Sequence, residues 1–140
     1  MGRNVEISKM QTLSAFRKIA LGTWETTYDP TIYGTMRIRM DKALEYIEKF
    51  REKTGRRVTV THLVVKALAQ VLKECPEANA VLRWNKIYLR QNVDVSVLVL
   101  MEDNGKMDLS STMLRNADQM SLVEMVDEIK VNVDRIRAKQ

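Results

Sequence analysis

The amino-acid sequence predicts an α+β fold in which helices cover a mixed or antiparallel β-sheet. The 140-residue chain is 45% hydrophobic and 29% charged, which is typical of a single globular domain. Its first half mostly shows the apolar spacing of amphipathic helices, and its second half mostly shows the alternation of strands. Only 5 glycines and 2 prolines interrupt these patterns, which excludes a collagen-like or low-complexity chain.

The first elements expected along the chain are a short helix and a strand. The helix is predicted over residues 11–21, where Leu13, Phe16 and Ile19 fall at helical spacing. Residues 35–40 then alternate between apolar and polar side chains over their whole length. That alternation predicts a strand with one buried face.

Two longer helices are predicted next. Asp41 is a favourable N-cap for the first of them, and Gly55 supplies the left-handed turn that ends it. The second begins near Thr61 and stops at Pro76, because proline cannot continue a helix. Its apolar stripe is wide, which is typical of a helix covered by the rest of the protein. The residues of that stripe are Leu63, Val64, Ala67, Leu68, Val71 and Leu72.

Strands dominate the second half of the chain, and a helix ends it. The predicted strands are residues 80–83, 87–90, 93–101 and 107–113, with the first two forming a hairpin around Asn85-Lys86. Ser121 and Glu124 form a capping-box pattern that opens the last helix. We expect residues 1–9 to be an N-terminal arm and residues 10–140 to be one domain.

Composition and charge narrow the function classes. A single Cys excludes an intramolecular disulfide and a cysteine-based zinc site, and we expect no metal site. Residues 1–90 carry 17 Lys and Arg against 9 Asp and Glu, whereas residues 91–140 carry 6 against 9. A basic half can attract an anionic ligand, a nucleic acid or an acidic partner. No basic cluster is interleaved with aromatic residues, so solvated faces are favoured over nucleic-acid binding.

No apolar run is long enough to cross a membrane, the longest being residues 97–101. We therefore expect a cytoplasmic protein without membrane contact.

Few side chains are candidates for chemistry. His62, the only histidine, is expected in the first turn of a helix among core positions, which favours a structural role over that of a general base. Cys75 is expected at a helix C-terminus, where the helix dipole disfavours a thiolate. The hydroxyl run at 110–112 is best explained by alternate faces of a strand. Asp94 and Asp108 could form a carboxylate pair, although solvation or pairing with an arginine of the 35–40 strand is favoured.

Methionine and aromatic residues suggest packing and assembly rather than a cofactor. Seven of the nine methionines occupy positions predicted to point mostly inward, which favours a core or interface role over copper binding. They are Met36, Met40, Met101, Met107, Met113, Met120 and Met125. Trp24, Tyr28 and Tyr33 cluster near one loop and are candidate assembly contacts, with local packing as the alternative.

Six sequence segments, taken in order, resemble those of a known family. These are residues 14–20, 40–41, 61–69, 75–79, 91–97 and 116–124. Together they resemble the catalytic domain of the dihydrolipoyl acyltransferases of 2-oxoacid dehydrogenase complexes, which has the chloramphenicol acetyltransferase-like fold. The resemblance implies trimers, larger cages built from them, and an active site between subunits. It also implies coenzyme A and a lipoyl group as reactants, a histidine as general base and a serine that stabilises the oxyanion.

The sequence departs from that family pattern in two places. The family's His-x-x-x-Asp-Gly signature does not occur in these 140 residues, so the resemblance covers only an N-terminal portion of the domain. The family's Gly-Leu-x-x-Pro-Val stretch is replaced by residues 105–112, which contain no proline. We therefore expect a truncated acyltransferase-like fold.

The function that follows is a non-catalytic, self-assembling protein that forms a trimer or a larger trimer-based assembly. We expect no catalytic residue in this chain and no cofactor. One alternative is an acyltransferase completed by a separate chain that carries the catalytic histidine. Another is binding of coenzyme A or an acyl thioester by this chain alone, with its basic half contacting the phosphates.

Overall fold

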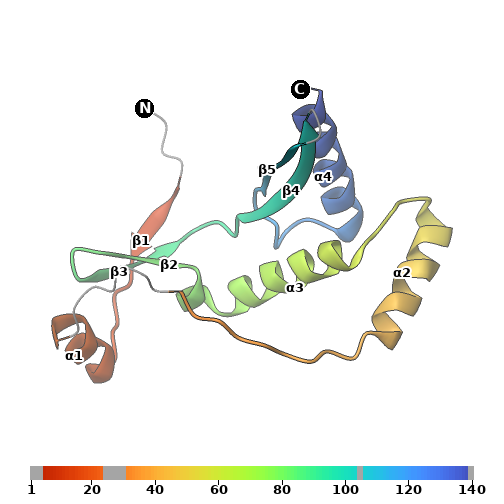
Figure 1. Ribbon diagram of the computed structural model, residues 1–140. Helices are drawn as coiled ribbons and strands as arrows, with labels where there is room; N and C mark the ends of the chain where they lie inside the picture. Colours follow the sequence, from red (N-terminus) through yellow and green to blue (C-terminus); the bar gives the residue numbers. More distant parts are fainter. Residues whose placement is uncertain (1–4, 24–30, 104–105, 139–140) are drawn as a thin grey trace.

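The computed structural model describes residues 5–23, 31–103 and 106–138, with the side chains of 101–103 and 106–108 left out of the description. The elements in chain order are β1 (Ile7–Lys9), α1 (Ala15–Thr23), α2 (Asp41–Thr54), α3 (Val60–Glu74), the 3-10 turn η1 (Pro76–Ala78), β2 (Ala80–Arg83), β3 (Lys86–Arg90), β4 (Val95–Asp103), β5 (Lys106–Leu114) and α4 (Leu122–Arg137). Figure 1 shows their arrangement, and the α+β class is confirmed.

The strands form two small antiparallel sheets. One sheet has three strands in the order β1-β3-β2, and the other is the two-stranded ribbon of β4 and β5. In the ribbon, Val95 pairs with Leu114 and Leu100 pairs with Leu109. Figure 1 shows the two sheets at separate ends of α3, the three-stranded one beside α1 and the ribbon beside α4. The short strand β1 has no counterpart among the predicted strands, because three residues carry too little alternation to be recognised.

The β2–β3 hairpin turns one residue earlier than predicted. Trp84 and Asn85 occupy the two turn positions, and both have a positive φ, 48° and 54°. A two-residue hairpin loop needs positive φ at both positions to match the twist of its strands. Asn85 is suited to that conformation, whereas Trp84 adopts it at a cost.

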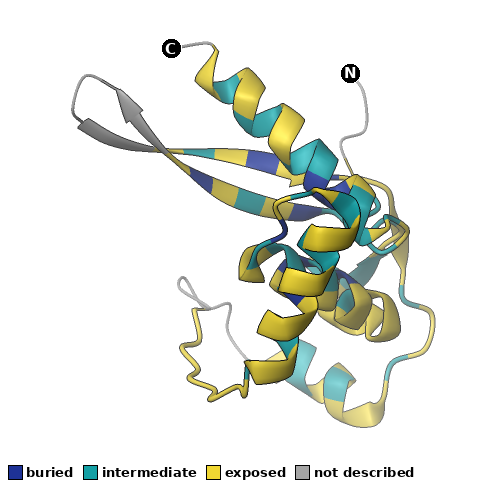
Figure 2. Cartoon of the chain, turned by 90° about the vertical axis from the view of Figure 1, so that its right-hand side faces the viewer, coloured by how far each residue is buried: buried dark blue, intermediate teal, exposed yellow. Residues whose placement is uncertain are grey.

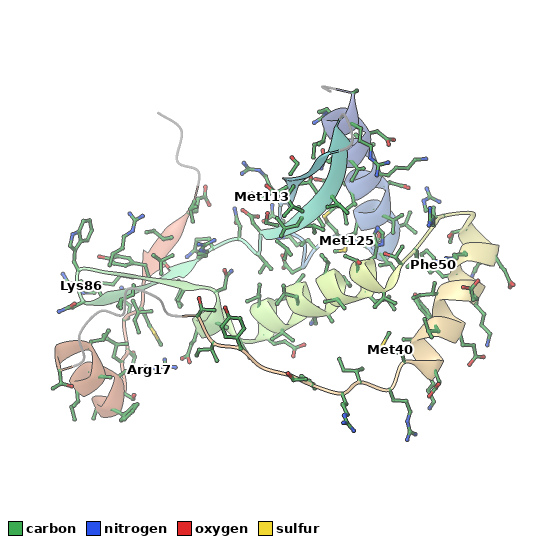
Figure 3. The ribbon with its side chains drawn as sticks, viewed as in Figure 1. Arg17, Met40, Phe50, Lys86, Met113 and Met125 are labelled. Carbon is green, nitrogen blue, oxygen red and sulfur yellow. The ribbon has the colours of Figure 1, made fainter. Side chains whose placement is uncertain are left out.

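The main core lies where α3 and α4 meet the ribbon. Its buried members are apolar side chains that come from α3, the segment before β4, both strands of the ribbon, the turn after β5 and α4. They are Val65, Ala69, Val93, Val95, Leu114, Ala117 and Met125. In Figure 3, Met125 lies at the junction of α4 with α3, and Figure 2 shows the dark-blue buried positions gathered along this junction.

A second, smaller core joins α2 to α4. Ile47, Val58 and Val126 are buried there, with Phe50 packed against them. The Arg56 guanidinium reinforces the junction, because its Nε and Nη2 atoms each donate to the Asp127 carboxylate at 2.8 Å. This pair fixes the loop between α2 and α3 onto α4.

Local signals placed the helix ends well. The Ser121 capping box is confirmed: the Glu124 backbone N–H donates to Ser121 Oγ at 3.2 Å, and the Ser121 N–H donates to Glu124 Oε2 at 2.7 Å. Gly55 has a φ of 66° and ends α2 as predicted. Asp41 is the first residue of α2 rather than its N-cap, which is Met40. In that place its carboxylate still lies near the positive end of the helix dipole.

Two predictions of burial are wrong for this chain. Residues 35–40 belong to neither sheet, and residues 31–39 are exposed although their alternation predicts a strand with one buried face. Four of the six residues in the apolar stripe predicted for this helix are also exposed, namely Val64, Ala67, Leu68 and Val71. In both cases the apolar periodicity predicts packing against another element, and no other described element packs there. None of the helices in the described part of the chain is long and apolar enough to span a bilayer.

Candidate association surface

His62 serves the fold rather than a reaction. It is the third residue of α3, and the backbone N–H of the N-cap Thr59 donates to its Nδ1 at 3.2 Å. Thr59 Oγ1 lies 2.6 Å from the same nitrogen. The imidazole thus takes the place that Glu or Gln holds in a usual capping box. Burial lowers the pKa of His62 below its ordinary value, which keeps Nδ1 free to accept.

The other candidates for chemistry also lack an activating neighbour in the described structure. Cys75 is exposed at the C-cap of α3, and its N–H donates to the Val71 carbonyl. Asp94 Oδ1 accepts from the backbone N–H of Asn116 at 3.0 Å, so it holds a turn instead of pairing with an arginine. Hydroxyl side chains alternate across β5 as predicted, with Thr112 buried and Ser111 exposed. The side chain of Asp108 lies outside the described residues.

Basic residues gather at the end of α2 without forming an open anion site. Arg51, Arg56 and Arg57 line a shallow hollow there together with Gly55. The Arg51 guanidinium donates to Glu48 at 2.9 Å and to the Val58 carbonyl at 3.0 Å. Because Arg56 is held by Asp127, two of the three cations already have protein partners. Within the described residues, no group of three or more His, Cys, Asp and Glu could hold a metal ion.

Methionines and aromatic residues divide between the core and the surface. Met125 is fully buried, as predicted, whereas Met36 and Met113 are exposed, because Met36 lies in the unpaired segment and Met113 on the outer side of β5. Met40 and Met120 are half-buried, and the side chains of Met101 and Met107 are not described. Tyr33 is 93% exposed, so it has no local packing in this chain. Trp24 and Tyr28 lie outside the described residues, and the three aromatic residues remain predicted assembly contacts.

The first exposed apolar surface lies on α3. Val60, Val64, Leu68 and Val71 recur at intervals of three or four residues and therefore share one side of the helix. All four are exposed, Val64 by 58% and Leu68 by 44%. We call these four residues the α3 stripe. The stripe carries no charge, which distinguishes it from the other exposed side of α3, where Gln70 and Glu74 bond to one another.

A second apolar surface is the side of the ribbon that faces away from the main core. Leu98, Leu100, Leu109 and Met113 alternate with the buried positions of β4 and β5, and each is more than half exposed. We call these four residues the outer ribbon face. Among the described strands, β4 and β5 form a ladder only with one another. Sheet edges and apolar faces of this kind are normally covered.

A third surface is the stretch of residues 31–40, which we call segment 31–40. Ile32, Met36 and Ile38 lie at alternate positions and are exposed, Ile32 by 93%. The intervening positions hold Arg37 and Arg39, and the segment contains no Asp or Glu. In the view of Figure 1 its trace passes below α3 on its way to α2.

The total accessible surface of the chain is larger than that expected for a compact monomer. The chain exposes 11,554 Å² of accessible surface for a mass of 16.2 kDa. A compact monomer of that mass exposes about 7,500 Å². The excess of about 4,000 Å² is comparable with the area buried in large obligate interfaces.

Sequence reasoning missed this site because it placed most of these side chains in a core. The signal was nevertheless present in the width of the α3 stripe and in the strict alternation of residues 35–40. Both features indicate apolar side chains that pack against another element, but they do not identify that element.

Comparison with known proteins places these surfaces in context. Residues 6–140 match the family model of the 2-oxoacid dehydrogenase acyltransferase catalytic domain. A relative from Rickettsia bellii, the dihydrolipoyllysine-residue acetyltransferase component of pyruvate dehydrogenase complex, is 32% identical over 112 residues, which are 77% of this chain and 26% of the relative. The chain thus spans about a quarter of the length of that curated relative.

Solved structures agree on the fold. A probable dihydrolipoamide acetyltransferase from Listeria monocytogenes superposes with a TM-score of 0.69 at 20% identity, covering 94% of this chain and 57% of the other. The cubic core of the pyruvate dehydrogenase multienzyme complex gives a TM-score of 0.57 at 25% identity, covering 71% and 42%. The chloramphenicol acetyltransferase-like fold is therefore confirmed for the part of the domain that these residues cover. With almost its whole length matched by the family model, this chain belongs to the 2-oxoacid dehydrogenase acyltransferase catalytic-domain family.

Proposed function

We propose that this chain is a non-catalytic assembly component that associates with further copies of itself into a trimer or a larger trimer-based particle. The observation that carries the proposal is the excess of about 4,000 Å² of accessible surface over a compact monomer. The exposed side chains include many large apolar ones, among them Leu98, Leu68 and Met36, and a monomer in water rarely gathers so many.

The outer ribbon face and the exposed aromatic residues are the surfaces best suited to self-association. Leu98 is 71% exposed at the centre of the ribbon, and Trp84 is 82% exposed at the tip of the β2–β3 hairpin. Large aromatic side chains are the usual anchors of protein interfaces. Closed cyclic symmetry is the usual outcome when a chain associates with itself. The similarity to the cubic core supports a trimer-based form.

The non-catalytic part of the proposal rests on His62. Its Nδ1 accepts from Thr59, so the imidazole is committed to the start of α3. Cys75 and Ser111, the other candidate nucleophiles, are exposed, and Cys75 lies at the C-terminal end of α3, where the helix dipole disfavours a thiolate. We propose that the chain alone performs no acyl transfer and needs no cofactor.

A second candidate function is an acyltransferase completed by a separate chain that carries the catalytic histidine. It is favoured by one observation: this chain covers 57% of the Listeria core, so more than two fifths of that structure has no counterpart here. In this case coenzyme A would bind only to the completed domain.

The mass of the native particle tests the first candidate. Size-exclusion chromatography with light scattering should give three chains, or a multiple of three, at micromolar concentration. A clean monomer would rule the proposal out. Titration calorimetry with coenzyme A tests the second: heat of binding that appears only with a co-purified partner would favour completion, and no binding in either preparation would argue against it.

A further inference from the structure

We infer that one face of the three-stranded sheet is a binding surface for single-stranded nucleic acid. The face combines four exposed cationic side chains, drawn from all three strands, with a half-buried tyrosine on the middle strand. We call it the basic sheet face, and its residues are Lys9, Arg83, Lys86, Tyr88 and Arg90. This inference goes beyond the proposed self-association and does not depend on it.

The register of the sheet puts these five residues on one side. Lys86, Tyr88 and Arg90 are alternate residues of β3, so their side chains project from the same face. Lys9 of β1 pairs directly with Tyr88. Arg83 of β2 pairs directly with Lys86, beside the hairpin turn, where Figure 3 labels Lys86. Because residues that pair directly across antiparallel strands share a face, the register joins cations that lie far apart in the sequence.

The three strands contribute no carboxylate to neutralise these cations, because β1, β2 and β3 contain no Asp or Glu. Glu6 precedes β1 two positions from Ser8 and so belongs to the other face, where Gln91 Nε2 donates to Ser8 Oγ at 2.6 Å. Glu77 is already paired with Arg17. None of the four cations forms an ion pair with a described residue.

The pairing of Arg83 with Lys86 is unfavourable for the fold alone. Like charges directly opposite each other destabilise a pair of strands, whereas opposite charges stabilise it. A carboxylate at either position would therefore suit the hairpin better. A bound polyanion removes the repulsion, because its phosphates neutralise both side chains.

The spread of the cations requires an extended ligand. At a rise of about 3.4 Å per residue, Lys86 and Arg90 lie about 14 Å apart along β3, and β1 and β2 lie about 10 Å apart on its two sides. A free phosphate or a single carboxylate cannot reach all four cations. A single nucleic-acid strand can, since it carries a negative charge at every nucleotide.

Tyr88 favours nucleic acid over an acidic peptide. It lies at the centre of the face, between Lys86 and Arg90 along β3 and next to Lys9 across the sheet. Bases stack on aromatic rings set among cations, and each stacked base strengthens binding by about 5- to 150-fold. The chain in linear order favours solvated faces, because Lys9 is remote from the hairpin, and it is the register that favours binding. Trp84, at the tip of the hairpin, stays a candidate anchor for self-association and is not required here.

The test measures binding of a fluorescein-labelled oligothymidylate of twelve nucleotides to the whole chain by fluorescence anisotropy, from 50 to 200 mM salt. Each phosphate contact adds about −0.7 to the slope of log affinity against log salt, so four contacts should give about −3. Lys86→Gln with Arg90→Gln should halve that slope and weaken binding at least tenfold at 50 mM salt. The matched control is Lys42→Gln with Lys53→Gln, which removes the same charge from exposed positions of α2 and should change affinity less than twofold. Tighter binding of an oligouridylate of the same length would identify RNA as the preferred strand.

The ring of Tyr88 is tested separately. Tyr88→Leu should weaken binding about tenfold without changing the salt slope, because stacking is lost while the phosphate contacts stay. Tyr88→Phe keeps the ring and should bind as tightly as the unsubstituted chain. Circular dichroism of each variant verifies that the fold is retained.

Four results would overturn the inference. The first is no binding of either oligonucleotide at 50 mM salt. The second is an equal loss of binding in the two double variants, which would reflect net charge alone. The third is displacement of the oligonucleotide by polyglutamate of equal charge as effective as that by unlabelled oligonucleotide, which would assign the face to an acidic partner. The fourth is a native mass changed by Lys86→Gln with Arg90→Gln, which would make the face an interface between copies of the chain.

Discussion

Truncation of Leu114 is the most direct test of where the stability of this chain resides. Leu114 ends β5, is fully buried and packs in the main core with residues from α3, α4 and the segment before β4. Replacing a fully buried leucine by alanine removes its transfer free energy and leaves a cavity, which together cost about 2–5 kcal/mol. A loss of about 3 kcal/mol would lower the melting temperature by about 6–12 °C in a chain of this size.

The matched control is Leu98→Ala, in the partner strand of the same ribbon. Because the Leu98 side chain is 71% exposed, its truncation should change the free energy of unfolding by less than about 0.5 kcal/mol in dilute monomer. Urea unfolding followed by circular dichroism measures both variants, and an unchanged m-value shows that only stability has changed. If Leu114→Ala leaves too little folded protein, Leu114→Met should cost less than about 1.5 kcal/mol and still report the site.

The reasoning fails if Leu114→Ala costs less than about 1 kcal/mol, or if both truncations cost the same in dilute solution. Concentration adds a further readout. If the outer ribbon face is an interface, the cost of Leu98→Ala should grow as the protein concentration rises, because association stabilises only the folded form. The cost of Leu114→Ala should stay constant.

Three further predictions concern single side chains. Burial lowers the pKa of His62 in the folded chain. As the pH falls below about 6.5, the unfolded chain therefore binds the proton first, and the free energy of unfolding should decrease toward pH 5. In urea midpoints measured at each pH, His62→Asn should flatten that dependence. The Arg56 guanidinium lowers the pKa of Asp127, so the pair stabilises the fold above the ordinary carboxylate pKa, and this stabilisation is lost on acidification. Arg56→Ala should therefore raise the pH at which acid unfolding occurs, as followed by circular dichroism. Asn tolerates the positive φ of position 84 better than Trp does, so Trp84→Asn should stabilise the hairpin by about 1 kcal/mol in urea unfolding. It should also weaken self-association if Trp84 is an anchor; a particle mass that is unchanged would remove Trp84 from the interface.

Features with a local cause were predictable from the sequence. The ends of α2 and α4 follow from Gly55 and from the Ser121–Glu124 capping box, which act within a few residues of chain. The ribbon follows from a long alternation that any sheet environment would preserve. The turn at Trp84 was missed by one residue, because tryptophan is not a residue expected at positive φ.

The candidate surface was not predictable from the sequence. Apolar periodicity predicts that a side chain is buried, but it does not tell which element or which chain buries it. Leu68 and Met36 have the spacing of buried residues, yet both are exposed in this structure. For the sequence as given, this is a conflict between local pattern and tertiary structure, and such conflicts mark functional sites or missing partners. All three uncovered surfaces have the same character, an apolar face of regular period with few charges.

That shared character decides between two explanations of the exposed surface. Random loss of cover would leave a scattered set of apolar side chains, each with polar neighbours. Here the α3 stripe keeps four apolar residues at helical spacing, and segment 31–40 keeps Ile32, Met36 and Ile38 at alternate positions. The outer ribbon face keeps four large apolar residues, with Ser96 and Ser111 as its exposed polar members. Only packing against a matching element benefits from such regularity. These faces are therefore the surfaces that the proposed association would bury.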